Sequence, residues 1–298
     1  MIERTFLKEL VNNPYLLSEL EFANISRILQ TVKNLFEEEN LLLDLKLKNR
    51  NKEIYVIGDI HGDLNTLLQI IKIIKEKNPE LVIFLGDIVD RGPKQLECFL
   101  MVIILKILHP QKYYLLKGNH ETLEMNQKYG FFQDFMSRFK NIEKFNEILM
   151  IYNVLPLCAL VNNSILCLHG GIPQDFEILD KLKNIKTKEL GTYINTLSQN
   201  LTQIMWNDPK SNLQGFSESF RGPGINFFGE DVFETFLKEN NLKFVIRSHE
   251  LFPEGYRWFF HGRLLSIFSS ANYRRKNPAY YAVINNDEIY PQILKFTS

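Results

Sequence analysis

Residues 54–62 read IYVIGDIHG, so that an apolar run of strand character leads directly into glycine, aspartate and histidine. The same arrangement recurs along the chain, where an apolar run ends beside a side chain able to bind a metal ion or a phosphate group. The further segments are LVIFLGDIVDRG (81–92), YYLLKGNHE (113–121), ILCLHGG (165–171) and FVIRSHE (244–250). Because loops at strand ends converge while the sheet holds them rigid, we expect these segments to meet at one crevice.

The repetition of this pattern decides between two interpretations. A single aspartate or histidine after a strand is more often a turn residue or a hydrogen-bonded core residue than a ligand. Random placement would not put Asp, His, Asn and Arg after five separate apolar runs, with glycine beside four of them. Glycine permits positive φ and lets the backbone approach an ion or a phosphate closely, so its presence favours a functional site.

The polar side chains of these segments indicate a pair of metal ions. They offer carboxylate, amide and imidazole donors without a thiolate, a set that suits Mn, Fe or Zn ions with open positions for water. The candidate ligands are more than one tetrahedral site needs: Asp59, His61, Asp87, Asn119, His169 and His249. Two ions roughly 3.5–4 Å apart can share a carboxylate and a bridging hydroxide for direct, in-line attack on phosphorus. An all-oxygen magnesium site would not require three histidines.

Three neighbouring residues complete the chemistry of a phosphoester hydrolase. Arg91 shares a loop with Asp87, and a planar guanidinium matches two phosphate oxygens, although a surface salt bridge is the ordinary role of an arginine. His120 directly follows Asn119, so it can face the site without binding metal and donate a proton to the leaving alkoxide. Asp90 is placed to hold that imidazole in one tautomer; the alternative is a loop-capping aspartate.

Composition and charge exclude several other classes of protein. Lys and Arg together number 35, as do Asp and Glu, so the net charge predicts neither a nucleic-acid partner nor an acidic membrane. Apolar stretches are interrupted by charges before they reach the roughly 18 residues that span a membrane, and the amino terminus is polar. Three cysteines without metal-site spacing, Cys98, Cys158 and Cys167, indicate reduced core residues. We therefore expect a soluble, intracellular, cytoplasmic protein.

The organisation of the chain indicates one compact domain with a helical start. Apolar residues recur at helical spacing from Leu16 to about Leu45, which predicts an amphipathic helix in an N-terminal helical cap over residues 1–50. From residue 51 to 298 strand-like runs alternate with helical stretches such as 64–77 and 94–108. No Pro/Gly/Ser-rich linker divides the chain, so we expect residues 51–298 to form a single metallophosphatase catalytic domain.

In order and spacing, the five segments resemble the signature of the phosphoprotein phosphatase (PPP) family of serine/threonine phosphatases. The resemblance covers about residues 50–290. ETLEMNQKYGF (121–131) is similar to the tetratricopeptide-linked branch, protein phosphatase five, and SANY (270–273) to the EF-hand branch. This sequence contains neither a tetratricopeptide segment nor an EF-hand loop.

The resemblance implies an α/β (α+β) protein with the calcineurin-like metallophosphoesterase fold, a central β-sandwich flanked by α-helices. It implies two divalent or trivalent ions, foremost Mn with Fe or Zn as alternatives. Asp59, His61 and Asp87 would hold the first ion, and Asp87, Asn119, His169 and His249 the second. It also implies that Arg91, Arg221, Asn119 and Tyr273 face the substrate phosphate and that His120 is the general acid paired with Asp90. The implied substrates are phosphoserine and phosphothreonine proteins; a regulatory subunit is left open.

Departures from the family pattern keep other functions open. The usual Trp-Ser-Asp-Pro is WNDP (206–209) here, and the usual Ser-Ala-Pro-Asn-Tyr-Cys is SSANYR (269–274), which puts substrate preference and toxin sensitivity in question. Diadenosine tetraphosphate hydrolases and small bacterial-type phosphatases share the first three segments but commonly differ at the last two. A non-catalytic binding module on the same fold would usually have lost ligands, and none is missing.

Overall fold

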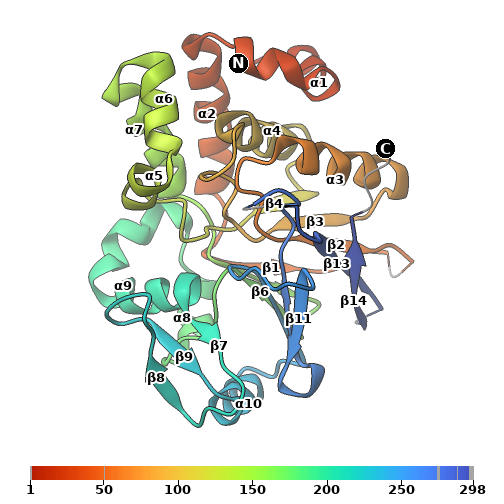
Figure 1. Ribbon diagram of the computed structural model, residues 1–298, viewed down its shortest axis with the longest axis vertical. Helices are drawn as coiled ribbons and strands as arrows, with labels where there is room; N and C mark the ends of the chain where they lie inside the picture. Colours follow the sequence, from red (N-terminus) through yellow and green to blue (C-terminus); the bar gives the residue numbers. More distant parts are fainter. Residues whose placement is uncertain (1, 50, 274–275, 287, 295–298) are drawn as a thin grey trace.

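Two β-sheets pack face to face at the centre of the protein, in a computed structural model that describes residues 2–49, 51–273, 276–286 and 288–294 (Figure 1). One sheet has the strand order β14 (Glu288–Ile293), β13 (Tyr280–Asn285), β2 (Ile54–Ile57), β3 (Leu81–Phe84), β4 (Tyr113–Leu115). The other has the order β1 (Leu42–Leu45), β5 (Cys158–Val161), β6 (Ile165–Leu168), β10 (Phe244–Arg247), β12 (Leu264–Ile267), β11 (Tyr256–Phe259). Strands β2, β3 and β4 run parallel, as do β6, β10 and β12.

An apolar core fills the space between the two sheets. Val56 and Ile83 project into it from the five-stranded sheet, and Cys167, Ile246 and Leu265 from the six-stranded sheet. Successive side chains of a strand point to opposite faces, so the alternate residues pack outward against helices. Burial on both faces explains why these strands are almost continuously apolar in sequence. The expected β-sandwich flanked by helices is confirmed.

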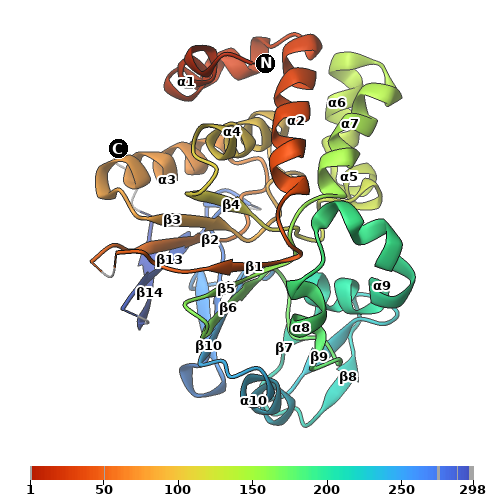
Figure 2. The same ribbon diagram turned by 180° about the vertical axis from the view of Figure 1, so that it is seen from behind.

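Helices cover both outer faces of the sandwich (Figures 1 and 2). The outer face of the five-stranded sheet packs in one core with α1 (Arg4–Asn12), η1 (Pro14–Glu19), α2 (Phe22–Glu37), α3 (Leu64–Lys77), α4 (Gln95–Leu108), α6 (Phe131–Phe139) and α7 (Ile142–Tyr152). The short helix α5 (Leu123–Tyr129) immediately precedes α6. The six-stranded sheet is covered by α8 (Ile178–Lys183), α9 (Leu190–Trp206), α10 (Glu230–Glu239) and η3 (Phe260–Gly262), and the short η2 (Thr187–Glu189) leads into α9. A small third sheet beside them has the order β7 (Asp208–Pro209), β9 (Asn226–Phe228), β8 (Phe216–Glu218).

The N-terminal region differs from the sequence prediction. Helices α3 and α4 match the expected helical stretches, but the single helix expected from Leu16 to about Leu45 is wrong. A 3₁₀ helix and α2 occupy its first part, and residues 42–45 form strand β1, which pairs in parallel with β5. A short apolar run such as LLDL has no periodicity that separates a buried strand from a helix, and pairing with β5 decides the outcome.

The N-terminal helices pack closely on the rest of the protein. Glu39, just after α2, accepts a hydrogen bond from Lys106 of α4, and both side chains are largely buried. Since β1 joins the six-stranded sheet, residues before 50 contribute to the sandwich itself; a cap over residues 1–50 stays a prediction. Among the described residues, every helix is too short or too polar to cross a bilayer.

Candidate functional site

The five motif segments meet at one edge of the sandwich. Strands β2, β3 and β4 of one sheet and β6 and β10 of the other all end there, and the loops after β2, β3, β4 and β10 line a cavity of about 360 Å³. His169, after β6, is fully buried beside Asp87. Motif residues in its wall include His61, Asp87, Asn119, His120 and His249. A larger hollow of about 490 Å³ lies between α1, α3 and α4, but none of the candidate ligands lines it, and Tyr113 at the start of β4 is its one residue from the five segments. The smaller cavity is therefore the candidate site.

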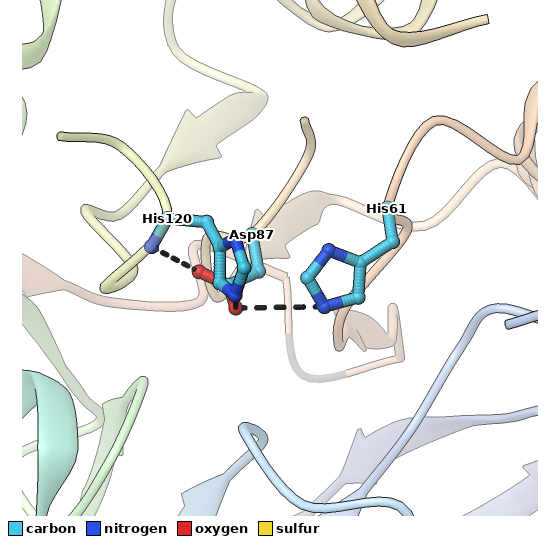
Figure 3. Close-up of side chains that lie close together, drawn as sticks. All are labelled: His61, Asp87 and His120. Carbon is cyan, nitrogen blue, oxygen red and sulfur yellow. Dashed lines mark hydrogen bonds and ion pairs between the residues drawn. The ribbon is translucent and has the colours of Figure 1, made fainter. Parts of the chain in front are cut away.

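Three histidine side chains of the site lie close to the carboxylate of Asp87. Its Oδ2 atom lies 3.6 Å from His61 Nε2, 3.9 Å from His120 Nε2 and 3.4 Å from His169 Nε2. Figure 3 shows this carboxylate with dashed lines to the His61 ring and to the backbone nitrogen of His120. Two groups able to hold a cation share Asp87, one with His61 and His120 and one with His169 and His249. Ligands around a tetrahedral ion with bonds of roughly 2.1 Å lie roughly 3.4 Å apart, so these separations fit bound metal.

Backbone carbonyls fix the orientation of two of these imidazoles. His61 Nδ1 donates to the carbonyl of Val89 at 2.9 Å, and His169 Nδ1 donates to that of Leu85 at 3.0 Å. Each ring therefore turns Nε2 toward Asp87, and a ligand histidine is commonly held in this way by a carbonyl on its other nitrogen. The sequence did not reveal these two carbonyls, because each belongs to an apolar residue of another loop.

The Nε2 atom of His169 is surrounded by other atoms that can bind a cation. Asn119 Oδ1 lies 2.9 Å from it and His249 Nδ1 lies 3.2 Å from it, in addition to Asp87. All of these atoms can supply an electron pair, so a shared proton or a metal ion must separate them. The Nε2 atom of His249 is buried and lacks a hydrogen-bond partner among the described residues. The donor set fits a two-metal site, although the first group contains His120, expected as the acid, while the expected ligand Asp59 lies beside His61.

The electrostatics of the protein itself also favour cation binding. Burial opposes the charged forms here, yet the hydrogen bond to Asp59 and the charge of Asp87 raise the pKa of His61 to about 9. Burial likewise opposes ionisation of Asp87, but His169 and His120 lower its pKa well below the usual range. Burial, and then the charge of Arg221, lowers the pKa of His249 well below its ordinary value, so this imidazole is neutral. Asp87 as a carboxylate and His249 as a neutral imidazole are therefore already in the forms that bind metal, whereas His61 would release a proton on binding.

Hydrogen bonds hold the ligand loops in register. Glu121 accepts from the backbone N–H groups of Asp87 at 2.8 Å, Ile88 at 2.9 Å and Gly118 at 2.9 Å, which ties the β3 loop to the β4 loop. A Cβ atom on Gly118 would lie 2.2 Å from Asp87 Oδ1, which explains the need for glycine there. Sequence reasoning gave Glu121 no role, because its partners are backbone groups of a distant loop.

Asp59 and Asp90, the remaining carboxylates of the motifs, have different partners. Asp59 Oδ1 accepts from the hydroxyl of Ser248 and from the backbone of His249 at 3.1 Å, and its Oδ2 lies 3.5 Å from His61 Nε2. Asp90 Oδ2 lies 2.7 Å from His120 Nδ1, which places the expected aspartate–histidine pair together.

The two expected phosphate-binding arginines both line the cavity, where Tyr273 also lies. Arg221 Nε donates to Asp208 Oδ2 at 2.5 Å, and the other oxygen of Asp208 accepts from Arg247 at 2.8 Å. Tyr273 stacks on His61 with ring centroids 4.8 Å apart. Asp208 and Arg247 were not singled out from the sequence for this tethering, and no spacing links them to Arg221. Arg274, which departs from the family pattern, lies outside the described residues.

Comparison with known proteins identifies the relatives of this chain. The model of the calcineurin-like phosphoesterase family matches residues 52–253. Human serine/threonine-protein phosphatase 5 is 35% identical over 99% of this chain, which spans 58% of that relative's length. The serine/threonine-protein phosphatase 4 catalytic subunit of Saccharomyces cerevisiae is 32% identical, over 84% of this chain and 80% of that protein.

Solved structures agree with the sequence relatives. A protein serine/threonine phosphatase from Saccharomyces cerevisiae, described as similar to human phosphatase PP5, superposes with a TM-score of 0.84 at 28% identity and covers 100% of this chain and 97% of its own. A cold-active protein-tyrosine phosphatase of Shewanella has a TM-score of 0.61 at 17% identity, over 88% of this chain and 84% of its own, which shows the shared fold alone. The chain belongs to the calcineurin-like phosphoesterases and, within them, to the phosphoprotein phosphatase family of serine/threonine phosphatases.

Proposed function

We propose that this protein is a metal-dependent phosphatase that removes phosphate from serine and threonine residues of other proteins. The observation that carries the proposal is the shared carboxylate: Asp87 joins two ligand groups in a cavity that two arginines also line. Asp59, His61 and Asp87 would hold one ion, and Asp87, Asn119, His169 and His249 the other. Two such ions, foremost Mn with Fe or Zn as alternatives, supply an activated water nucleophile and neutralise negative charge on the phosphate.

Side chains of the protein bind the phosphate and donate the proton to the leaving group. Arg91 and Arg221 bind the oxygens of the substrate phosphate through their guanidinium N–H groups, and the amide of Asn119 faces the same group. His120 donates a proton to the departing serine or threonine oxygen, and Asp90 holds its Nδ1–H so that Nε2 faces the cavity. Tyr273 forms part of the wall beside the phosphate.

The class of substrate rests on the relatives. Human protein phosphatase 5, the yeast phosphatase 4 catalytic subunit and the yeast structure are all serine/threonine phosphatases by name. The buried, unpaired Cys98, Cys158 and Cys167 favour a reducing compartment, in keeping with phosphoprotein substrates inside the cell. A regulatory protein subunit is left open.

Hydrolysis of three substrates tests the proposal. The manganese-loaded protein should hydrolyse a phosphoserine or phosphothreonine peptide with a higher kcat/KM than the matched phosphotyrosine peptide and diadenosine tetraphosphate. A preference for the dinucleotide would assign the site to a different class of phosphoester. The variant His120→Asn is the matched control: although His120 lies near Asp87, the proposed first ligand set is Asp59, His61 and Asp87, so the variant should retain metal and lose peptide hydrolysis.

A further inference from the structure

The arginines of this edge of the sandwich are held in two different ways. Asp208 accepts hydrogen bonds from Arg221 and from Arg247, and Glu250 accepts a second one from Arg247. Arg91 is different: within the described part of the chain, its guanidinium forms neither an ion pair nor a hydrogen bond. All of its N–H groups are therefore left for a ligand, but no carboxylate restrains their direction.

The aromatic ring of Tyr129 takes the place of that carboxylate. The Arg91 Cζ atom lies 3.6 Å from the centroid of the Tyr129 ring, whereas the ring of Tyr273 is 5.6 Å away. A ring face attracts a guanidinium and fixes its plane without consuming any N–H donor. The backbone N–H of Arg91 also donates to the carbonyl of Tyr129 at 3.1 Å. One residue thus holds both the backbone and the head group of Arg91.

The position of Tyr129 follows from the end of helix α5. Tyr129 is the last residue of α5, and Gly130 caps the helix with φ near 114° before α6 begins. From the same junction, Asn126 Nδ2 donates to Asp90 at 3.0 Å and the backbone N–H of Phe131 donates to Asp90 at 3.1 Å. This short segment therefore fixes Asp90 through hydrogen bonds and its neighbour Arg91 through a ring.

We propose that Tyr129 is a positioning residue that orients Arg91 for the substrate phosphate while leaving all its N–H donors available. The proposal rests on the function proposed above and adds that Arg91 and Arg221 bind the phosphate in different ways. Arg221 already commits Nε to Asp208, whereas Arg91 can present a two-pronged face to phosphate. Without the ring, Arg91 would sample many directions, and phosphate binding would have to order it.

A double-mutant cycle on phosphate affinity tests this role. The dissociation constant of inorganic phosphate, measured by calorimetry on manganese-loaded protein, should rise roughly five- to thirtyfold in Tyr129→Leu, because the ring and the guanidinium are desolvated once phosphate covers them. Tyr129→Phe keeps the ring face and should recover most of the affinity. In an Arg91→Ala background, Tyr129→Leu should produce no further loss.

A second arginine–aromatic pair supplies the matched control. Arg138 lies over the ring of Phe139 at 4.8 Å in α6, outside the cavity, so Phe139→Leu should leave phosphate affinity unchanged. Should Tyr129→Leu fail to fold, Tyr129→Met, which fills more of the same space, replaces it in the cycle. The proposal would be overturned if Tyr129→Leu or Tyr129→Met weakened phosphate binding equally in the presence of Arg91 and in the Arg91→Ala background. The cycle measures phosphate binding, so its failure would count against the role of Tyr129 alone. Failure of the proposed function would instead appear as a protein that binds phosphate but does not hydrolyse phosphoserine peptides.

Discussion

Replacing Asp90 by asparagine isolates proton donation from metal binding. The carboxylate is fully buried and accepts three hydrogen bonds, from His120 Nδ1 at 2.7 Å, Asn126 Nδ2 at 3.0 Å and the Phe131 backbone at 3.1 Å. Asparagine has the same shape but only one acceptor oxygen. If that oxygen stays with Phe131, the new NH₂ group faces His120 Nδ1, which must then accept a hydrogen bond instead of donating one.

The size of the effect follows from what His120 loses. A positioned general acid contributes roughly 10²–10⁴-fold, and His120 would lose the acceptor that holds its Nδ1–H and orients the ring. We therefore expect kcat on a phosphoserine peptide to fall roughly 10²–10⁴-fold in Asp90→Asn. On p-nitrophenyl phosphate the loss should be roughly tenfold or less, since that leaving group needs little protonation. Stability should fall by about 1.5–3 kcal/mol, because buried donors lose a charged acceptor.

The assay is steady-state kinetics on both substrates, with metal content measured on the same samples. Metal content should match the unmodified protein, since Asp90 belongs to neither ligand group. His120→Asn should reproduce the kinetic pattern, and the double variant should be no slower than the slower single variant. Equal losses on the peptide and on p-nitrophenyl phosphate would refute an acid role for this pair.

Three further changes test other parts of the structure. Asp87→Asn should lower occupancy of both ions, because Asp87 belongs to both ligand groups; elemental analysis that returned two ions per chain would contradict the shared role. Asp208→Asn should lower the free energy of unfolding by about 3 kcal/mol, because Arg247 is fully buried and loses half of its carboxylate partners; an unchanged urea midpoint would argue against it. Lys106→Met should cost about 3–5 kcal/mol by leaving Glu39 buried without its cation. Adding Glu39→Gln should recover most of the lost free energy of unfolding in the same assay. A double variant less stable than Lys106→Met alone would contradict the pairing.

The residues that the structure brings together around Asp87 were predictable from the sequence because each is a local signal. An apolar run that ends in Gly-Asp, Asn-His or His-Gly can be recognised without knowing which sheet the strand joins. The sheet assignment was not predictable in this way: β2 and β3 lie in one sheet and β6 and β10 in the other. That division depends on long-range pairing and on burial, which a single strand does not encode.

The groups that support the ligands were harder to predict. Arg221 and Tyr273 were expected only from family resemblance, since no neighbouring motif marks them. Glu121 stands inside a motif, yet its role is a brace between two loops through backbone N–H groups. Asp208 acts through Arg221 and Arg247, which lie 13 and 39 residues away in sequence. Such roles exist only in the folded arrangement, so composition and spacing carry no trace of them.

Backbone conformation links the rigid sandwich to the chemistry of the site. His61, Asp87, Asp90, Arg91 and His249 all adopt positive φ, a left-handed conformation that disfavours side chains with a Cβ atom. Each costs on the order of 1–2 kcal/mol, so together they approach the roughly 5–15 kcal/mol by which a whole domain is stable. Neighbouring strands and loops must offset this cost, and the contacts are present: His61 N–H donates to the carbonyl of Asp87 at 2.9 Å, and Arg91 N–H to that of Tyr129. Strain of this kind persists only where the surroundings determine the conformation, which is why the functional loops begin at buried strands rather than in flexible segments.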